Sequence, residues 1–233
     1  MSIKILGVSG SPIPNSNTDR AVKGVLEFSG IESEFIKLSE IDVRPCQACK
    51  RCVGDNICKV DDDFPALANK IREAEALVIG AYCPYGMIDA HTKAFLERLW
   101  SMRHVNNLNA GKQVVIIVTG IAPAGISRRR KFLEGLLNPV IKKKLPIHEV
   151  SNGIAREMRM ENMQVISTIK IRGNVPCLTC GKGSECKMSG VPILFGKDIK
   201  ATSDLCICVE DQIKVWKEIK QSGILLGKRI SGE

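Results

Sequence analysis

Four cysteines lie within thirteen residues of this chain, in the spacing C-x2-C-x2-C-x5-C: Cys46, Cys49, Cys52 and Cys58. Four thiolates this close together on an irregular loop can converge on one cubane iron–sulfur cluster. Pro45 opens the segment and Gly54 allows the chain to turn back, so that the fourth thiolate can close the site. We therefore expect a [4Fe-4S] cluster. The alternatives are zinc, which more often takes two separated pairs, and disulfides, which need an oxidising compartment.

A second group of cysteines repeats the x2 and x5 spacings of the last three members of the first: Cys177, Cys180 and Cys186. A fourth ligand would come from Cys206 or Cys208, and we take Cys206. This C-x-C pair lies near the start of an expected helix, where alternate residues point apart, so only one of the two could join. The Cys-x-x-Cys-Gly sequence also suits zinc. Three interpretations of this second group therefore remain open: a second iron–sulfur cluster, a zinc ion, or free or redox-active thiols.

A turn rich in hydroxyl and amide side chains follows the first apolar run of the sequence. Its candidate phosphate-binding residues are Ser9, Ser11, Ser16, Asn17 and Thr18. Backbone N–H groups at a helix N-terminus attract a phosphate. No lysine follows in the position of a nucleoside-triphosphate loop, and no GxGxxG fingerprint occurs, so a singly phosphorylated cofactor fits better than a dinucleotide. An ordinary capped loop is the alternative, because Ser and Asn favour turns.

The remaining pattern alternates strands with helices. Apolar runs predict strands at 3–8, 33–38, 76–82, 113–119 and 165–171, and helices are expected at 18–28, 64–75, 90–102 and 128–144. This order predicts an α/β fold with a doubly wound, five-stranded parallel sheet. Ligands of such sheets bind beyond the carboxyl ends of the strands, here at 9–18, 83–90 and 120–127. Thr202 or Ser203 is expected to cap a last helix that reaches about residue 221.

Three motifs together resemble the iron–sulfur flavoprotein family: SGSPxxxSNT, CxxCxxC-x5-C, and Pro84-Tyr85-Gly86 ahead of the KAFLER sequence at 93–98. That family lies within the NADPH-dependent FMN reductases, which are flavodoxin-like. The resemblance covers about residues 3–120 well and the rest loosely. It implies a flavodoxin-like FMN-binding domain over 1–172, including the cluster loop 44–60. Residues 173–233 would be a Cys-rich segment and a C-terminal helix packed on that domain.

The resemblance also implies the cofactor contacts and the partners. The phosphate would be bound by the hydroxyl-rich turn, and the isoalloxazine ring by Pro84, Tyr85, Gly86, Met87, Thr119 and Gly120. Electrons would pass between a ferredoxin-type carrier and an acceptor. The subunits would form a homodimer or homotetramer in which each cluster lies near an FMN across the interface. One departure is that Ile13 and Pro14 follow Pro12, where the family places a basic residue.

Composition limits the other functions. The formal charge of the 233 residues is +9, and cluster thiolates and a flavin phosphate would bring it to about +5. The dense basic runs at 128–130 and 142–144 suit a solvated helix face or an acidic electron carrier. Only 4% of residues are aromatic, so nucleic-acid binding is not expected. No apolar stretch approaches a membrane span and no leader precedes the first strand, so we expect a cytoplasmic protein without a membrane partner.

Nothing in the sequence marks a catalytic base. The three histidines are isolated, the acidic run at 61–63 suits a helix N-terminus, and Cys83 suits small-residue packing at a strand end. We expect an FMN- and cluster-containing oxidoreductase that couples the one-electron chemistry of a cluster to flavin. The alternatives are an NAD(P)H-dependent FMN or quinone reductase with a structural metal, and a non-catalytic redox- or metal-sensing protein of the same fold.

Overall fold

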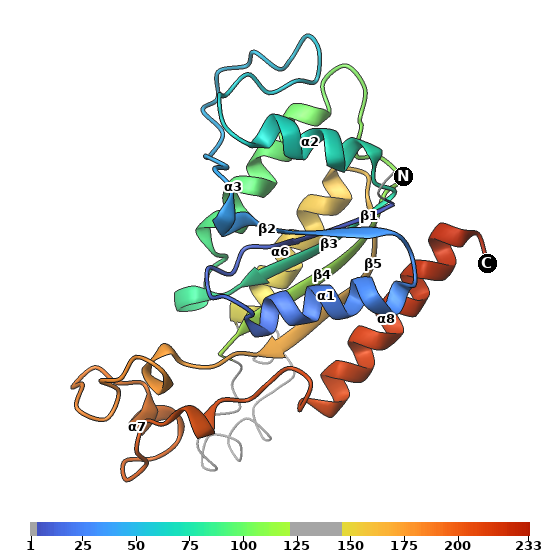
Figure 1. The fold of residues 1–233 in the computed structure, drawn as a ribbon. Helices are drawn as coiled ribbons and strands as arrows, with labels where there is room; N and C mark the ends of the chain where they lie inside the picture. Colours follow the sequence, from blue (N-terminus) through green and yellow to red (C-terminus); the bar gives the residue numbers. More distant parts are fainter. Residues whose placement is uncertain (1–3, 122–145) are drawn as a thin grey trace, which may run out of the picture.

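A computed structural model describes residues 4–121 and 146–233. Five parallel strands form one sheet in the order β2-β1-β3-β4-β5 (Figure 1). Their bounds are β1 (Ile5–Ser9), β2 (Ser33–Lys37), β3 (Ala76–Tyr82), β4 (Gln113–Gly120) and β5 (Gln164–Arg172). The three central strands are apolar and almost wholly buried because helices cover both faces. The expected doubly wound α/β fold is confirmed.

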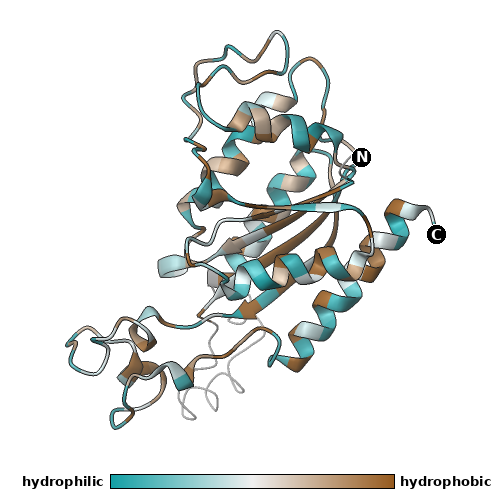
Figure 2. Ribbon diagram, in the orientation of Figure 1, coloured by the Kyte–Doolittle hydropathy of each residue, from teal (hydrophilic) through white to brown (hydrophobic). Residues whose placement is uncertain are grey.

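Helices pack on both faces of this sheet. On one face lie α1 (Asn17–Ser29) and α8 (Ile213–Ser231), and on the other lie α2 (Phe64–Glu73), α3 (Ala90–Leu99) and α6 (Pro146–Met160). Figure 2 shows largely apolar central strands between helices that carry both apolar and polar residues. Alternate residues of one strand serve the two cores: Leu6 packs in the core with Phe64 and Phe95, and Ile5 packs in the core with Val25 and Ile219.

The last helix differs from the expectation. Thr202 precedes only a short 3-10 turn, Ser203–Leu205. The helix α8 begins at Ile213 and runs to Ser231, and Gly232 caps its end at a φ of 80°. The helix α8 continues through Gly223 and Gly227, and both glycines pack closely against α1. A Cβ atom at Gly227 would come within 2.1 Å of the Ser29 carbonyl oxygen. They are sites of close helix contact and not helix ends.

Pro146 follows the helix expected at 128–144, where a proline would end it, but the structure shows that Pro146 begins α6. Proline suits the first turn of a helix because the N–H that it lacks would have no intrahelical acceptor. The helix predicted at 128–144 and both dense basic runs lie outside the described residues. Within the part of the chain that the structure describes, no helix is both long and apolar enough to cross a membrane.

Candidate flavin and metal sites

The turn after β1 is fixed by the start of α1. The Asp19 N–H donates to Ser16 Oγ at 3.1 Å, and the Ser16 N–H donates to Asp19 Oδ2 at 3.1 Å. This reciprocal capping box fixes where α1 begins, and the first N–H groups of a helix have no acceptor within it. The turn lies beside the β1–β3 boundary, where strand order reverses and where folds of this kind bind FMN.

A lysine from β2 supports the turn in place of the basic residue that is absent at Ile13. Lys37 Nζ donates to Asp19 Oδ2 at 2.6 Å and to the Ile13 carbonyl oxygen at 2.8 Å. Ser9 Oγ donates to the other Asp19 oxygen at 2.6 Å. Both members of the ion pair are buried, so Asp19 neutralises the lysine. A phosphate would therefore depend on hydroxyl and backbone N–H donors.

The structure places the predicted phosphate residues in different surroundings. Ser11 is buried, with its hydroxyl 3.4 Å from the Ile13 nitrogen. Thr18 Oγ1 donates to Thr119 Oγ1 at 2.9 Å, which joins the first turn to the end of β4. The Asn17 side chain points the other way and binds the backbone near residue 207. Only its main-chain N–H remains on the turn.

The turn after β3 exposes an aromatic ring in a strained conformation. Tyr85 lies in the Pro84–Gly86 turn with a φ of 49° and a fully exposed side chain, and Met87 is also mostly exposed. A left-handed non-glycine residue costs on the order of 1 kcal/mol. Exposed apolar side chains at the carboxyl end of a central strand are suited to covering a planar ligand.

Asp89 holds this turn in place, a role that the sequence did not reveal. Its carboxylate accepts from the Tyr82 N–H at 3.0 Å and from the N–H and hydroxyl of Thr92, each at 2.7 Å. Burial raises the pKa of Asp89, although these hydrogen bonds partly oppose the rise. Gly10 packs directly against it, since a Cβ there would lie 2.4 Å from Asp89 Oδ1. This packing holds the carboxyl ends of β1 and β3 together.

The end of β4 completes the described part of this edge. The Cys83 N–H donates to the Thr119 carbonyl oxygen at 2.8 Å. A Cβ on Gly120 would lie 3.1 Å from Cys83 Cβ, so the two strand ends are closely packed. Burial raises the pKa of the Cys83 thiol, which disfavours a reactive thiolate. Residues 122–127 of the candidate loop lie outside the described residues.

The first cysteine group converges on one hollow. All four of its thiols line a cavity closed by the end of α3: Cys46, Cys49, Cys52 and Cys58. Cys52 is buried, and the first two are exposed. Lys50, Lys59 and Arg98 line the same cavity together with one acidic residue, Glu97, and the Arg51 guanidinium lowers the pKa of the Cys49 thiol. Four thiols among cations fit a [4Fe-4S]2+ cluster, which carries a net charge of about −2 once ligated.

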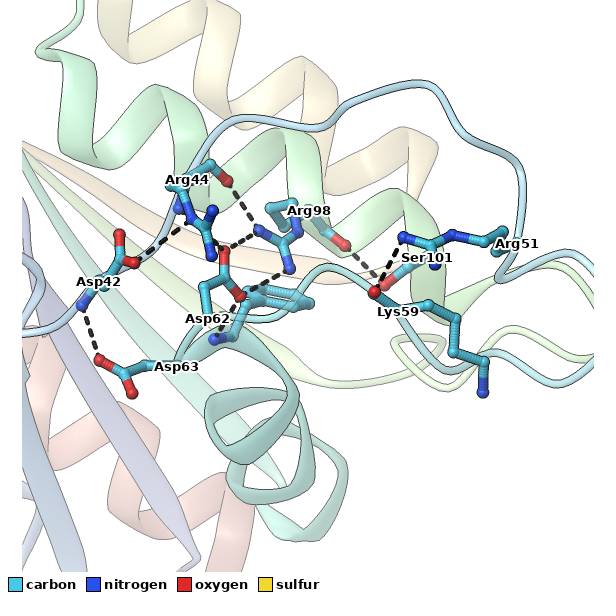
Figure 3. Close-up of polar contacts among 9 residues, drawn as sticks. Asp42, Arg44, Arg51, Lys59, Asp62, Asp63, Arg98 and Ser101 are labelled. Carbon is cyan, nitrogen blue, oxygen red and sulfur yellow. Dashed lines mark hydrogen bonds and ion pairs between the residues drawn. The ribbon is translucent and has the colours of Figure 1, made fainter.

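A buried ion pair supports the wall of this cavity (Figure 3). Arg98 Nη1 donates to Asp62 Oδ2 at 2.5 Å and to the Arg44 carbonyl oxygen at 2.8 Å, and Nη2 donates to Asp62 Oδ1 at 3.0 Å. Burial opposes ionisation of Asp62, but Arg98 and two backbone N–H groups outweigh it and hold its pKa below the ordinary value. Burial alone would lower the pKa of the Arg98 guanidinium. Asp62 and the neighbouring Cys58 outweigh it and raise that pKa. The sequence indicated helix capping for the acidic run and missed this pair.

The second cysteine group is only partly brought together. Cys177 and Cys206 pack against one small apolar cluster, whereas Cys180 and Cys186 are exposed. In residues 4–121 and 146–233, no three Cys, His, Asp or Glu side chains lie close enough to hold one metal ion. In this arrangement neither cysteine group is set around a single ion.

Comparison with known proteins agrees with this geometry. The sheet and its flanking helices are flavodoxin-like, and its carboxyl edge is the candidate flavin site. The chain belongs to the NADPH-dependent FMN reductase family, whose model matches residues 3–141. An iron-sulfur flavoprotein of Methanocaldococcus jannaschii is 32% identical over 129 residues, which are 54% of this chain and 64% of that protein. One from Methanosarcina thermophila is 32% identical over 107 residues, 45% of this chain and 56% of that protein.

These matches confirm the expected resemblance to iron–sulfur flavoproteins. The chain spans less than two thirds of the length of these two relatives. Among solved structures, RosB with a bound formylriboflavin phosphate has a TM-score of 0.60 at 16% identity, over 99% of this chain and 81% of that one. The Trp repressor binding protein of Bacillus subtilis gives 0.56 at 14% identity, over 94% of this chain and 99% of that one. At such identities the likeness shows the fold alone.

Proposed function

We propose that this protein is an FMN- and [4Fe-4S]-containing oxidoreductase that passes electrons between a ferredoxin-type carrier and an acceptor. The observation that carries the proposal is the convergence of four closely spaced thiols on one cation-lined cavity, in a chain of the FMN reductase family. When bound, the cluster would supply one-electron transfer and FMN would exchange one or two electrons. An FMN reductase without a cluster has no need for such a cavity.

The chain's own residues have distinct tasks in this proposal. The start of α1, with Ser11 and Ser16, would bind the phosphate, and the exposed Tyr85 and Met87 would cover the isoalloxazine ring. Asp89 would hold that turn in place through its three hydrogen bonds. None of these groups is required to move a proton.

The positions of the two sites favour an oligomer. The Tyr85 turn precedes the N-terminus of α3, whereas the cysteine cavity is closed by the residues that follow its C-terminus, Trp100 and Ser101. A helix of ten residues spans about 15 Å, so the two candidate sites of one chain lie at opposite ends of α3. A symmetric neighbour that places its flavin at the exposed thiols would shorten the path, which supports a homodimer or homotetramer.

The outer rim of the cavity favours an acidic electron carrier. Lys50 and Arg51 are exposed beside the thiols. Positive side chains around a redox centre steer an acidic partner toward it and orient it on arrival. This charge favours a ferredoxin-type donor over a neutral quinone, although NADPH, which is also anionic, remains the competing donor to test.

Anaerobically purified protein tests the cofactors. Mass spectrometry of the released flavin should find FMN, and Cys49→Ala should lose about four irons and four sulfides per chain while retaining flavin. Cys83→Ala is the matched control and should keep all of its iron. FAD in place of FMN, or unchanged iron in the Cys49 variant, would contradict the assignment.

Rapid mixing tests the donor. Reduced ferredoxin should reduce the bound flavin faster than NADPH does, and the ferredoxin rate should fall with rising salt. A faster reaction with NADPH would favour the reductase alternative. Sedimentation should show at least a dimer, and a fully active monomer would contradict the shared site.

A further inference from the structure

The segment between β5 and α8 has too small a core to account for a fixed conformation. Residues 173–212 contain only three short helical turns, and their apolar cluster has three buried members, Val175, Leu178 and Val191. Large apolar side chains nearby, such as Met188 and Ile193, are 88% and 80% exposed. Chain segments of about 40 residues rarely fold on a core of this size without a disulfide or a metal.

The chain turns back on itself around Cys177. The Gly190 N–H donates to Cys177 Sγ at 3.4 Å, and Cys180 Sγ lies 3.6 Å from the Cys177 carbonyl oxygen. A Cβ at Gly183 would lie 2.0 Å from that same oxygen, so only glycine fits there. The turn that leads to Cys186 is thus folded tightly against Cys177.

Cys206 is held near Cys177 through the next residue, Ile207, whose backbone is bound by two asparagine side chains. We call this set of hydrogen bonds the clamp. Asn174 pairs with the backbone of Ile207 through two hydrogen bonds, of 2.9 and 3.1 Å. On the other side Asn17, from the candidate phosphate turn, donates to the Ile207 carbonyl oxygen at 2.8 Å and accepts from the Val209 N–H at 3.1 Å. The clamp fixes the extended backbone on both sides of Ile207.

Packing distinguishes the two cysteines that flank Ile207. Cys206 packs on the small apolar cluster together with Cys177, whereas Cys208 is not part of that cluster. Cys206 is therefore the fourth thiol of the group, and Cys208 serves as its natural control.

We propose that four thiols of this segment bind a second iron–sulfur cluster: Cys177, Cys180, Cys186 and Cys206. The ligand is a cluster because the spacing repeats that of the first group. The cluster would fix residues 173–212 and stand next to the candidate phosphate turn through the Asn17–Ile207 contact. That adjacency rests on the proposed FMN site, but the cluster itself does not.

Iron, sulfide and zinc are measured per chain in full-length protein purified anaerobically, for the wild type, Cys206→Ser and Cys208→Ser. The wild type should contain about eight irons, Cys206→Ser about four, and Cys208→Ser as many as the wild type. Unchanged iron in Cys206→Ser, or the loss of one zinc instead, would overturn the cluster. Iron loss in Cys208→Ser alone would overturn the choice of Cys206.

The same substitutions in a Cys49→Ala background separate this proposal from the first cluster. Cys49→Ala should keep about four irons, which Cys49→Ala/Cys206→Ser should lose. If the first group binds no cluster, the wild type would hold about four irons and Cys206→Ser none, so the two proposals fail independently. Flavin content reports whether the main domain is folded. If Cys206→Ser does not accumulate, the exposed Cys180→Ser must give the same loss of iron, and unchanged iron there overturns the proposal.

Discussion

Arg98 and Asp62 form a two-point ion pair at 2.5 and 3.0 Å, and both side chains are fully shielded from solvent. The guanidinium also lies over the Phe64 ring, 4.6 Å from its centre, and beside Cys58. The pair thus connects the start of α2, the end of α3 and the wall of the cysteine cavity. A charge left alone in this place would have no water to solvate it.

Removing one member of this pair should destabilise the protein strongly. Asp62→Ala leaves the Arg98 charge buried and uncompensated, so the free energy of unfolding should fall by about 3–5 kcal/mol. Asp61→Ala, at an exposed neighbouring position, should change it by less than about 0.5 kcal/mol. Urea unfolding followed by circular dichroism measures both. Equal stabilities of the two variants would show that the pair contributes little.

The same carboxylate should make stability depend on pH in the acid range. Its folded pKa is depressed, so its contribution is fully present above its unfolded pKa of about 3.9 and is lost as the pH falls through the folded pKa. The difference in unfolding free energy between the wild type and Asp62→Asn should therefore shrink as the pH falls below about 4. A difference that stays constant from neutral to acid pH would contradict this.

Gly10 should not tolerate a side chain. Gly10→Ala would place a Cβ 2.0 Å from Thr92 Oγ1 and 2.4 Å from Asp89 Oδ1, which must push the first and third strand ends apart. We expect a loss of at least tenfold in FMN affinity, equivalent to about 1.4 kcal/mol, measured by flavin fluorescence titration of the deflavinated protein. Gly153→Ala, whose Cβ would meet open space, should bind FMN like the wild type. Equal affinities would exclude this packing as a determinant of the site.

Asn17 should hold the C-terminal segment more than the phosphate. Asn17→Ala removes two hydrogen bonds to the backbone at 207 and 209, so limited proteolysis within residues 173–212 should become several-fold faster. Asn15→Gly is the control, because Asn15 is exposed at a φ of 48°. If Asn17→Ala instead weakens FMN binding without changing the cleavage rate, its amide acts on the phosphate and not on the segment.

Sequence patterns alone predicted most of the sheet and the first cysteine group. The strand expected at 76–82 is confirmed residue for residue, and the helix expected at 18–28 is present as α1, with Ser16 as its cap. These features are local, because burial imposes apolar runs on strands and capping needs residues only three positions apart. The spacing of the cysteine loop is local in the same sense, since its four thiols lie within thirteen residues.

Tertiary structure decided the contacts that join distant parts of the chain. Asp62 and Arg98 are 36 positions apart, and Asn17 and Ile207 are 190 apart. Both asparagine and aspartate have ordinary local roles at helix starts, so their residue types do not reveal a distant partner. The late start of α8 has the same origin, because the backbone before it is held in an extended form by the two asparagine side chains. Such pairings depend on where packing places whole elements, and no local pattern in the sequence encodes that placement.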